Sequence, residues 1–417
     1  MSIPVRPPRL GGWLRRHSLT LVATLGGAAG VALAVARYHP QAATPPAAQA
    51  ATPAAAAAPA PAPAELPRDT VLDTVQIALV LDTSSSMNGL INQARSHLWK
   101  MVDDLGTMTR VVDGKVRGVR VELALYEYGN DTLPAKGGYI RQVLPLTTDL
   151  DKVSEQLHAL FTNGGSEYAG QAIETAVTSL AWSSDPSALR FVLLAGNESF
   201  DQGPVTAAKA MALAASKDIT VQLVHCGGPE ASWSAAAALA KSDLLTIDQN
   251  RVAQHIPAPQ DDEILQLGAA LNATYLAYGA DGQAAAARQA SADVSSAKLS
   301  KKVAVERNAL KAKAAYKNDR WDVVDAVDKD AGWLARTPDR ELPAELRGKS
   351  LAEKQQLVAA KAAERAALKA RIGKLEAERT RFVEAERAKQ AGADAPSLET
   401  EMKKSTRKAA AKKGYQL

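Results

Sequence analysis

The sequence predicts an α/β domain, with a Rossmann-like, open and mainly parallel sheet flanked by helices, followed by an all-α extension. Three observations predict this fold class. Short apolar runs alternate with amphipathic segments from residue 71 to about residue 278. Beyond residue 279 the strand-like runs stop, and Ala, Lys, Arg and Glu become the dominant residues. A segment made almost entirely of Ala and Pro, residues 40–67, precedes the first apolar run.

Hydrophobic periodicity places the strands and helices of the domain in order. Residues 75–81 form a continuous apolar run, typical of a buried strand, and the apolar positions over 90–105 then recur at helical spacing. Residues 120–128 and 139–146 alternate as the two strands of a hairpin do. Further strands are expected at 191–195, 219–225 and 244–247, with helices at 169–180, 205–215, 233–240 and 263–271.

The N-terminal segment has the features of an export signal. Basic residues precede an uncharged run over 18–36 that ends in a small-residue site. We interpret residues 1–36 as a signal peptide or signal anchor and residues 37–68 as a stiff Ala/Pro-rich linker. The sequence therefore predicts an exported protein, either periplasmic or anchored to the inner membrane and facing the periplasm.

Charge and composition argue against several classes of function. Residues 69–297 carry 15 basic and 26 acidic side chains, whereas residues 298–417 carry 29 and 18. Nucleic-acid binding by the acidic body is not expected, because its own field would oppose it. The single Cys226 and the scattered His residues offer neither a disulfide framework nor a zinc cluster. The sequence has no nucleophile elbow and no phosphate-binding loop of the P-loop type, so we do not expect an enzyme.

A D-x-S-x-S motif, made of Asp82, Ser84 and Ser86, follows the first predicted strand. Open α/β sheets place ligands at the carboxyl ends of their strands. A carboxylate and two hydroxyls are hard oxygen ligands that suit Mg²⁺ or Mn²⁺. The alternative interpretation is a helix cap, since Ser and Asp also cap helices. Because Asp82 opens a loop, we expect its side chain at the surface.

The strand, the motif and the following helix together resemble a von Willebrand factor type A (VWA) domain, and the likeness covers about residues 72–278. In that family D-x-S-x-S is the basis of a metal-ion-dependent adhesion site. The resemblance implies that Ser166, in a Gly-Gly-Ser context, supplies a further hydroxyl ligand. The family's third-loop Asp position is occupied here by Gly196. We therefore expect Asn197, Glu198 or a water to substitute for the missing carboxylate.

Segments 196–204, 225–227, 247–250 and 316–326 are similar to those of bacterial exported VWA-domain proteins with a helical C-terminal extension. On this basis we assign residues 69–278 to the VWA domain and residues 279–417 to a basic helical extension. The resemblance implies a non-catalytic protein-binding module of the cell envelope, whose metal ion accepts a carboxylate from a protein partner.

Two other functions stay open at this point. In the first, the domain is a structural or assembly scaffold whose basic tail binds anionic lipid, cell-wall polymer or a partner helix. In the second, it is the VWA partner of an ATP-driven chelatase or MoxR-like ATPase system, which the export signal disfavours.

The extension carries three expectations of its own. Leu368, Ile372, Leu375 and Phe382 have a spacing compatible with a short coiled-coil seam, which would allow an oligomer. An intramolecular helical hairpin is our default interpretation of the same residues. The basic run at 403–413 is expected to be solvated and loose. The opposite charges of body and extension predict that the extension docks on the domain and that salt weakens this docking.

Overall fold

The structure is a computed structural model, and it describes residues 72–248, 255–389 and 398–416, with the side chains of 398–402 left out. All of these residues belong to one unit of the chain, Ala60–Leu417. The predicted signal (1–36) and linker (37–68) lie outside the described residues. Within the described ranges, no helix combines the length and the apolar character that crossing a bilayer requires.

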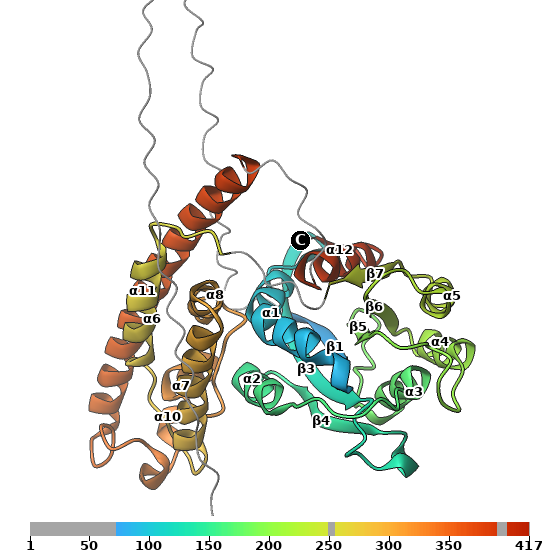
Figure 1. Cartoon of the computed structure of the whole chain (residues 1–417). Helices are drawn as coiled ribbons and strands as arrows, with labels where there is room; N and C mark the ends of the chain where they lie inside the picture. Colours follow the sequence, from blue (N-terminus) through green and yellow to red (C-terminus); the bar gives the residue numbers. More distant parts are fainter. Residues whose placement is uncertain (1–71, 249–254, 390–397, 417) are drawn as a thin grey trace, which may run out of the picture. The chain divides into compact units, whose positions relative to one another are not determined.

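A sheet of eight strands forms the centre of the domain (Figure 1). The strands are β1 (Leu72–Asp82), β2 (Thr109–Val112), β3 (Lys115–Tyr128), β4 (Ile140–Thr147), β5 (Leu189–Gly196), β6 (Thr220–Cys226), β7 (Leu244–Ile247) and β8 (Tyr415–Gln416). Their order is β7-β6-β5-β1-β3-β2-β8, with β4 also paired to β3. Strands β7, β6, β5, β1 and β3 run parallel, whereas β2, β4 and β8 pair antiparallel. The predicted open, mainly parallel sheet is confirmed.

Helices follow most strands of the domain and make up most of the extension. They are α1 (Asn88–Gly106), α2 (Leu150–Ala159), α3 (Ala169–Ser179), α4 (Ala207–Ser216), α5 (Ala231–Ala240), α6 (Asp261–Asn272), α7 (Gly282–Leu299), α8 (Lys301–Lys311), α9 (Val323–Lys329), α10 (Trp333–Arg336), α11 (Leu351–Lys389) and α12 (Leu398–Ala411). Three short 3-10 turns are η1 (Ser85–Met87), η2 (Ala135–Gly137) and η3 (Asp339–Glu341).

Side chains that alternate along β1 build two apolar cores, one on each face of the sheet. Ile77 and Leu79 pack in the core with residues of α1 and α2, while Ala78 and Val80 pack with residues of α3, α4 and α5. Because both faces are covered, the strand is apolar along its whole length, as parallel strands buried on two sides usually are. This sandwich holds the carboxyl end of β1 rigidly between β3 and β5.

Two strands were not predicted from the sequence. Strand β2 pairs with the start of β3, and β8 pairs with β2, so that Thr109 lies opposite Gln416. Both are short, and β2 has no fully buried residue that would give an alternating pattern. A strand of the extension thereby completes one edge of the sheet.

Helices α7 and α8 of the extension contribute side chains to the apolar core of the domain. Ala292, Val303 and Leu310 are buried in the same apolar cluster as α1 and α2. The Arg307 guanidinium, fully buried, pairs with Asp151 of α2 at 2.8 Å and lies over the Trp99 ring. Residues on either side of position 278 therefore belong to one packed interior.

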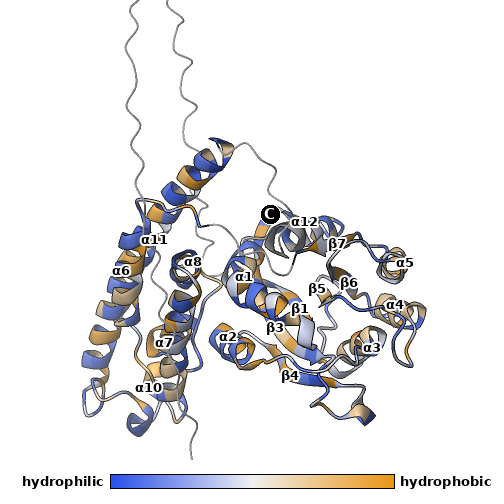
Figure 2. Ribbon diagram, in the orientation of Figure 1, coloured by the Kyte–Doolittle hydropathy of each residue, from blue (hydrophilic) through white to orange (hydrophobic). Residues whose placement is uncertain are grey.

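The apolar seam of α11 is used within the chain. Ile372 and Leu375 are buried against residues of α6 and α8, and Leu368 is partly buried beside them. Phe382 is only half-buried. Most of the remaining surface of α11 is hydrophilic (Figure 2). The intramolecular interpretation of this seam is thus confirmed for the residues that pack.

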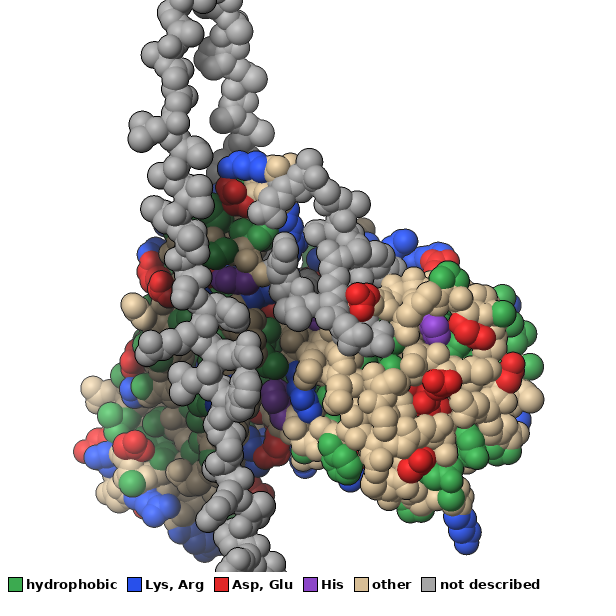
Figure 3. Space-filling model, in the orientation of Figure 1, with side chains coloured by type: hydrophobic (Ala, Val, Ile, Leu, Met, Phe, Trp, Pro, Cys, Tyr) green, Lys and Arg blue, Asp and Glu red, His purple; other side chains and the backbone are tan. Residues whose placement is uncertain are grey.

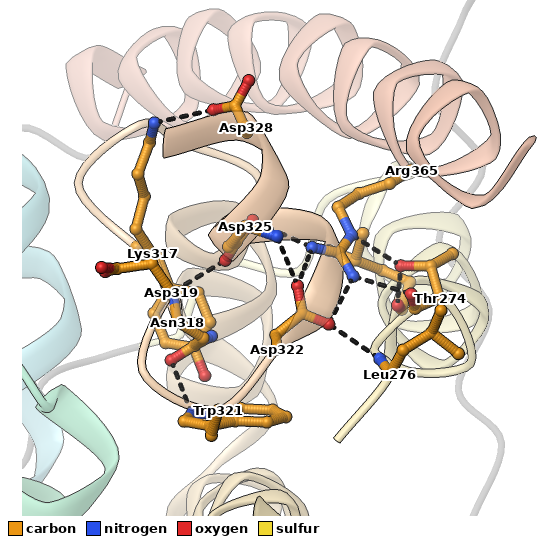
Figure 4. A network of polar contacts seen from close by, with 12 residues as sticks. Thr274, Leu276, Lys317, Asn318, Asp319, Trp321, Asp322, Asp325, Asp328 and Arg365 are labelled. Atoms are coloured by element: carbon orange, nitrogen blue, oxygen red, sulfur yellow. Dashed lines mark hydrogen bonds and ion pairs between the residues drawn. The ribbon is translucent and has the colours of Figure 1, made fainter. Parts of the chain in front are cut away.

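A buried polar network joins α11 to the segments that flank it in space (Figure 4). Arg365 of α11 donates to Asp322 Oδ2 at 2.6 Å and to Asp325 Oδ1 at 2.9 Å. It also donates to the Thr274 carbonyl at 2.7 Å. Asp322 in turn accepts from the Leu276 N–H at 2.7 Å. This network ties the end of the domain, α9 and α11 together.

The expectation of a loose, solvated run at 403–413 is wrong. Within this part of α12 the small residues Ser405, Thr406 and Ala410 are buried. Lysines on either side of them pair with carboxylates of the domain: Lys403 with Asp104 (3.2 Å), Lys408 with Asp243 (2.7 Å) and Lys413 with Asp218 (2.6 Å). Residues 403–413 dock on the domain because their small side chains permit close packing and the surrounding lysines form ion pairs with its carboxylates.

Candidate metal centre

Asp82 is the last residue of β1 and lies at the carboxyl edge of the parallel strands. Its side chain is 0% exposed, so the expectation of a surface carboxylate is wrong, because β1 lies between β3 and β5. The Ser84 N–H donates to Asp82 Oδ1 at 2.7 Å. Asp82 Oδ2 is buried and has no hydrogen-bond partner among the described residues. A carboxylate oxygen buried in this way costs free energy that a bound cation would recover.

Ser84 and Ser86 lie next to Asp82 at the start of η1. Ser84 is buried and Ser86 is exposed, and their Oγ atoms lie 3.3 Å apart. Across the edge, Asn197 Nδ2 donates to Ser86 Oγ at 3.1 Å. No side-chain cap hydrogen bond is made by Ser84 as N-cap of η1. The Ser86 hydroxyl therefore contacts the third loop, and the Ser84 hydroxyl beside it does not cap η1.

The loop that carries Ser166 is fixed to the D-x-S-x-S loop by backbone hydrogen bonds. The Asn163 N–H donates to the Thr83 carbonyl at 2.9 Å, and the Ser85 N–H donates to the Gly164 carbonyl at 3.0 Å. Ser166 itself forms an isolated antiparallel bridge with Gly129, the residue after β3. The structure therefore brings the second loop to the same edge as Asp82.

Glu167 is a functional candidate that the sequence analysis missed. Its side chain is buried, and a Cβ on Gly129 would lie 2.8 Å from Glu167 Cγ and 2.9 Å from Asp82 Oδ1. The two carboxyl groups thus flank one glycine, whose positive φ and missing side chain leave room for both. Burial, followed by the charge of Asp82, raises the pKa of Glu167 to about 9. Burial also raises the pKa of Asp82, and hydrogen bonding with Glu167, followed by that with Ser84, partly offsets this.

Only its place directly after Ser166 could have pointed to Glu167. Its approach to Asp82 depends on Gly129, which is remote in sequence from both carboxylates.

The third loop begins at Gly196, where the family resemblance implies an Asp. A Cβ at position 196 would overlap the Tyr128 hydroxyl and lie 3.1 Å from Asp82 Oδ2. Tyr128 is buried and donates to the Ala195 carbonyl at 3.3 Å. A tyrosine on β3 therefore fills the space that a side chain at 196 would need.

The two proposed substitutes, Asn197 and Glu198, lie differently. Asn197 is half-buried, and its side chain reaches Ser86. Its carbonyl is 3.0 Å from His225 Nε2, which holds the loop in place. Glu198 is exposed, and its carbonyl accepts from Trp233 Nε1 at 2.7 Å. The structure thus places the amide of Asn197 against the Ser86 hydroxyl, whereas the Glu198 carboxylate lies exposed at the border of the site.

The donor set at this edge fits a hard divalent cation. It consists of two buried carboxylates, the hydroxyls of the motif, the Ser166 loop and one amide, all of them oxygen donors. Among the described residues, His, Cys, Asp and Glu nowhere form a group of three that could hold a metal. A cation at this edge would therefore depend on hydroxyls as much as on carboxylates.

His225 and Cys226 at the end of β6 have structural roles. Cys226 is buried, and burial raises the pKa of its thiol well above the ordinary value. His225 packs against Trp233, with ring centroids 5.2 Å apart. Cys226 is thus a core thiol beside a hydrogen-bonded histidine, since His225 Nε2 lies 3.0 Å from the Asn197 carbonyl.

Comparison with solved structures gives several similar chains. A proximal thread matrix protein from the mussel byssus, with a zinc-occupied MIDAS motif, is 12% identical over 42% of this chain and 42% of its own, at a TM-score of 0.32. An aerotolerance-related membrane protein from Bacteroides fragilis is 15% identical over 42% and 93%, at 0.30. A von Willebrand factor type A protein from Catenulispora acidiphila is 17% identical over 42% and 39%, at 0.32. This chain therefore spans less than half of the mussel and Catenulispora chains.

A comparison with curated proteins found no match. The family model of the von Willebrand factor type A domain matches residues 76–243. This range begins within β1 and ends just before β7. It contains the D-x-S-x-S motif and both loops that meet it. Together with the mainly parallel sheet, this match identifies residues 76–243 as a von Willebrand factor type A domain.

Proposed function

We propose that this domain is a non-catalytic, metal-dependent protein-binding module of the bacterial cell envelope. The observation that carries the proposal is the buried Asp82, whose Oδ2 lacks a hydrogen-bond partner among the described residues at an edge lined by oxygen donors. A bound Mg²⁺ or Mn²⁺ would supply the missing charge, and a carboxylate from a protein partner would complete its coordination.

The ligands we propose come from three loops. Asp82, Ser84 and Ser86 form the first group, and Ser166 of the second loop adds a hydroxyl. In the third loop Asn197 would act directly, while Glu198 would act through water because its side chain is exposed. Glu167 joins this set as the second carboxylate. It replaces the charge that the family's third-loop Asp would carry, since Tyr128 occupies that space.

The envelope location rests on the predicted export signal over residues 1–36. The same signal argues against a cytosolic ATPase partner. The scaffold alternative, in which the extension binds envelope components, is weakened by its internal pairing. Lys311 and Lys313, for instance, are engaged by Asp293 and by Asp103.

Titration calorimetry with Mn²⁺ and Mg²⁺ tests the metal site. Asp82→Asn keeps the shape of the buried side chain but removes its charge, so we expect Mn²⁺ binding to be lost while the fold remains. Glu167→Gln should weaken binding on the order of tenfold, because ligand charge sets divalent affinity. In the metal-free protein it should stabilise the fold only above about pH 9, where Glu167 ionises and would repel Asp82, and should change stability little at neutral pH.

Glu155→Gln is the matched control, because Glu155 is an exposed carboxylate on α2 away from the three loops. It should leave both metal affinity and stability unchanged. If Asp82→Asn binds Mn²⁺ as well as the parent chain does, the metal site is refuted and the scaffold function becomes the better proposal.

A further inference from the structure

The loops around the candidate metal centre have a one-sided charge. They are residues 82–87, 129–133, 160–168, 197–204 and 227–230, all described in the structure, and none contains Lys or Arg. The nearest cations along the chain are Lys136 in η2 and Lys209 in α4, and Lys209 is paired with Glu174. Arg95 of α1 contacts one of these loops from below, where its guanidinium donates to the Leu160 carbonyl at 2.9 Å. Such an edge attracts cations and repels anions.

Carboxylates stand at the rim of the same edge. Asp131, Glu198 and Asp201 are exposed. Glu230 is half-buried, and its hydrogen bonds to Ser232 and the N–H of Trp233 lower its pKa, so it stays charged. Figure 3 shows Asp and Glu side chains spread over the front of the domain, with Lys and Arg toward its border.

Asp82 gives the independent indication that a ligand enters this edge. Its side chain is 0% exposed, and its Oδ2 has no hydrogen-bond partner among the described residues. The buried carboxylate without a partner suits a metal ion, and the acidic rim around it then faces any molecule that binds to this ion. One divalent cation adds two positive charges. These are too few to neutralise Asp82 and Glu167 together with the carboxylates at the rim.

A partner that offers only acidic side chains would therefore be repelled by the rim. We infer that the partner of this edge is a basic protein surface in which one Asp or Glu stands among Lys and Arg side chains. The single carboxylate binds the metal, and the surrounding cations pair with Asp131, Asp201 and Glu230. This inference rests on the proposed function and adds the chemical class of the partner.

An apolar contact accompanies these charges. Phe161, on the loop that carries Ser166, is 58% exposed although it is a large aromatic side chain. Its carbonyl accepts from Asn130 Nδ2 at 3.0 Å, which holds the residue at the rim. Exposed aromatic residues often anchor protein interfaces. The basic partner surface therefore carries an apolar side chain beside its carboxylate.

Four fluorescent nonapeptides test this inference with the full chain. Three of them carry a central Asp-Leu pair, flanked by Lys, by Ser or by Glu. The fourth is the Lys peptide with Asn in place of Asp. With Mn²⁺ present, fluorescence anisotropy should show the Lys peptide binding at least about tenfold more tightly than the Glu peptide. The Asn peptide should lose the dependence on Mn²⁺, and raising the salt from 0.1 M to 1 M should weaken the Lys peptide most.

Rim variants separate the inference from the proposed function. Asp131→Asn combined with Asp201→Lys should leave Mn²⁺ binding intact but weaken the Lys peptide severalfold and improve the Glu peptide. Glu345→Lys reverses an exposed charge on the extension and should change neither. If Mn²⁺ binds but the Glu peptide is preferred, or no peptide binds, the inference is refuted while the metal site stands. If Mn²⁺ does not bind at all, both fail.

Discussion

Tyr128 decides the composition of the candidate metal centre more than any residue of the D-x-S-x-S motif. Its hydroxyl occupies the space beside Gly196, so the third loop has no side chain at its first position. The charge that would have come from this loop comes instead from Glu167, beside Ser166. Compared with the family pattern, the site therefore has the same number of carboxylates, but one of them belongs to the second loop instead of the third.

Paired substitutions test this exchange. Gly196→Asp alone should destabilise the fold by about 1–3 kcal/mol, because the new side chain overlaps Tyr128 in a packed interior. Combining it with Tyr128→Phe removes the overlapping hydroxyl, so we expect stability to return and Mn²⁺ binding to tighten. Urea denaturation and calorimetry measure the two effects, with Tyr128→Phe as the control. Equal stability of Gly196→Asp with and without Tyr128→Phe would contradict this account.

Helix α11 owes its position to both buried apolar residues and a buried cation. Arg365 is 4% exposed and satisfies two aspartates and a backbone carbonyl. Arg365→Met should destabilise the protein by about 3–5 kcal/mol, because it leaves Asp322 and Asp325 buried without their counter-charge.

Arg371→Met is the matched control on the same helix. Arg371 pairs with Glu263, but both side chains are nearly half exposed, at 45% and 44%. Exposed pairs contribute at most about 1 kcal/mol, so this variant should lie close to the parent in urea denaturation. A similar loss of unfolding free energy in both variants would mean that the buried Arg365 network does not hold α11 in place.

Helix α8 makes stability depend on pH through Lys311. Burial, only partly offset by Asp293, lowers the pKa of Lys311 to about 8 from its ordinary value of 10.5. Between these values the unfolded chain binds more protons than the folded chain, so stability rises with pH. The stability of the parent relative to Lys311→Met should therefore increase from pH 8 to pH 10.5. A difference that stays constant over this range would refute the shift.

The apolar pattern of the sequence predicted strands and helices correctly where the apolar run was long. Strands β1, β5 and β6 are buried along almost their whole length, so their apolar runs were plain. Strand β8 has two residues and exists only because β2 lies beside it. Similarly, D-x-S-x-S pointed to Asp82, whereas Glu167 depends on a contact across Gly129 that no local pattern encodes. Local chemistry was predictable, and contacts between distant segments were not.

At the scale of the whole molecule, the basis of docking differs from the one expected from net charge. The extension contacts the domain through apolar residues such as Val303 and Leu310 and through the fully buried Arg307. Buried pairs are screened much less by salt than exposed ones.

We therefore expect the extension to stay docked when salt rises from 0.1 M to 1 M, contrary to the expectation from charge alone. Small-angle scattering should give the same radius of gyration at both concentrations. The exposed pairs between extension and domain, such as Lys408 with Asp243 and Lys301 with Asp262, should respond, as a small loss of stability. A marked expansion at 1 M salt would show that net charge dominates after all.

The pairing of β8 with β2 sets an order of events during biosynthesis. Strand β2 lies early in the domain, and its partner lies at residues 415–416, so most of the chain must leave the ribosome before the two can meet. Until then the outer edge of β2 presents unpaired backbone groups, which are prone to pair with other chains. Contacts between such distant segments also form slowly. A chaperone that holds the nascent chain would protect this edge until α12 and β8 arrive to close it.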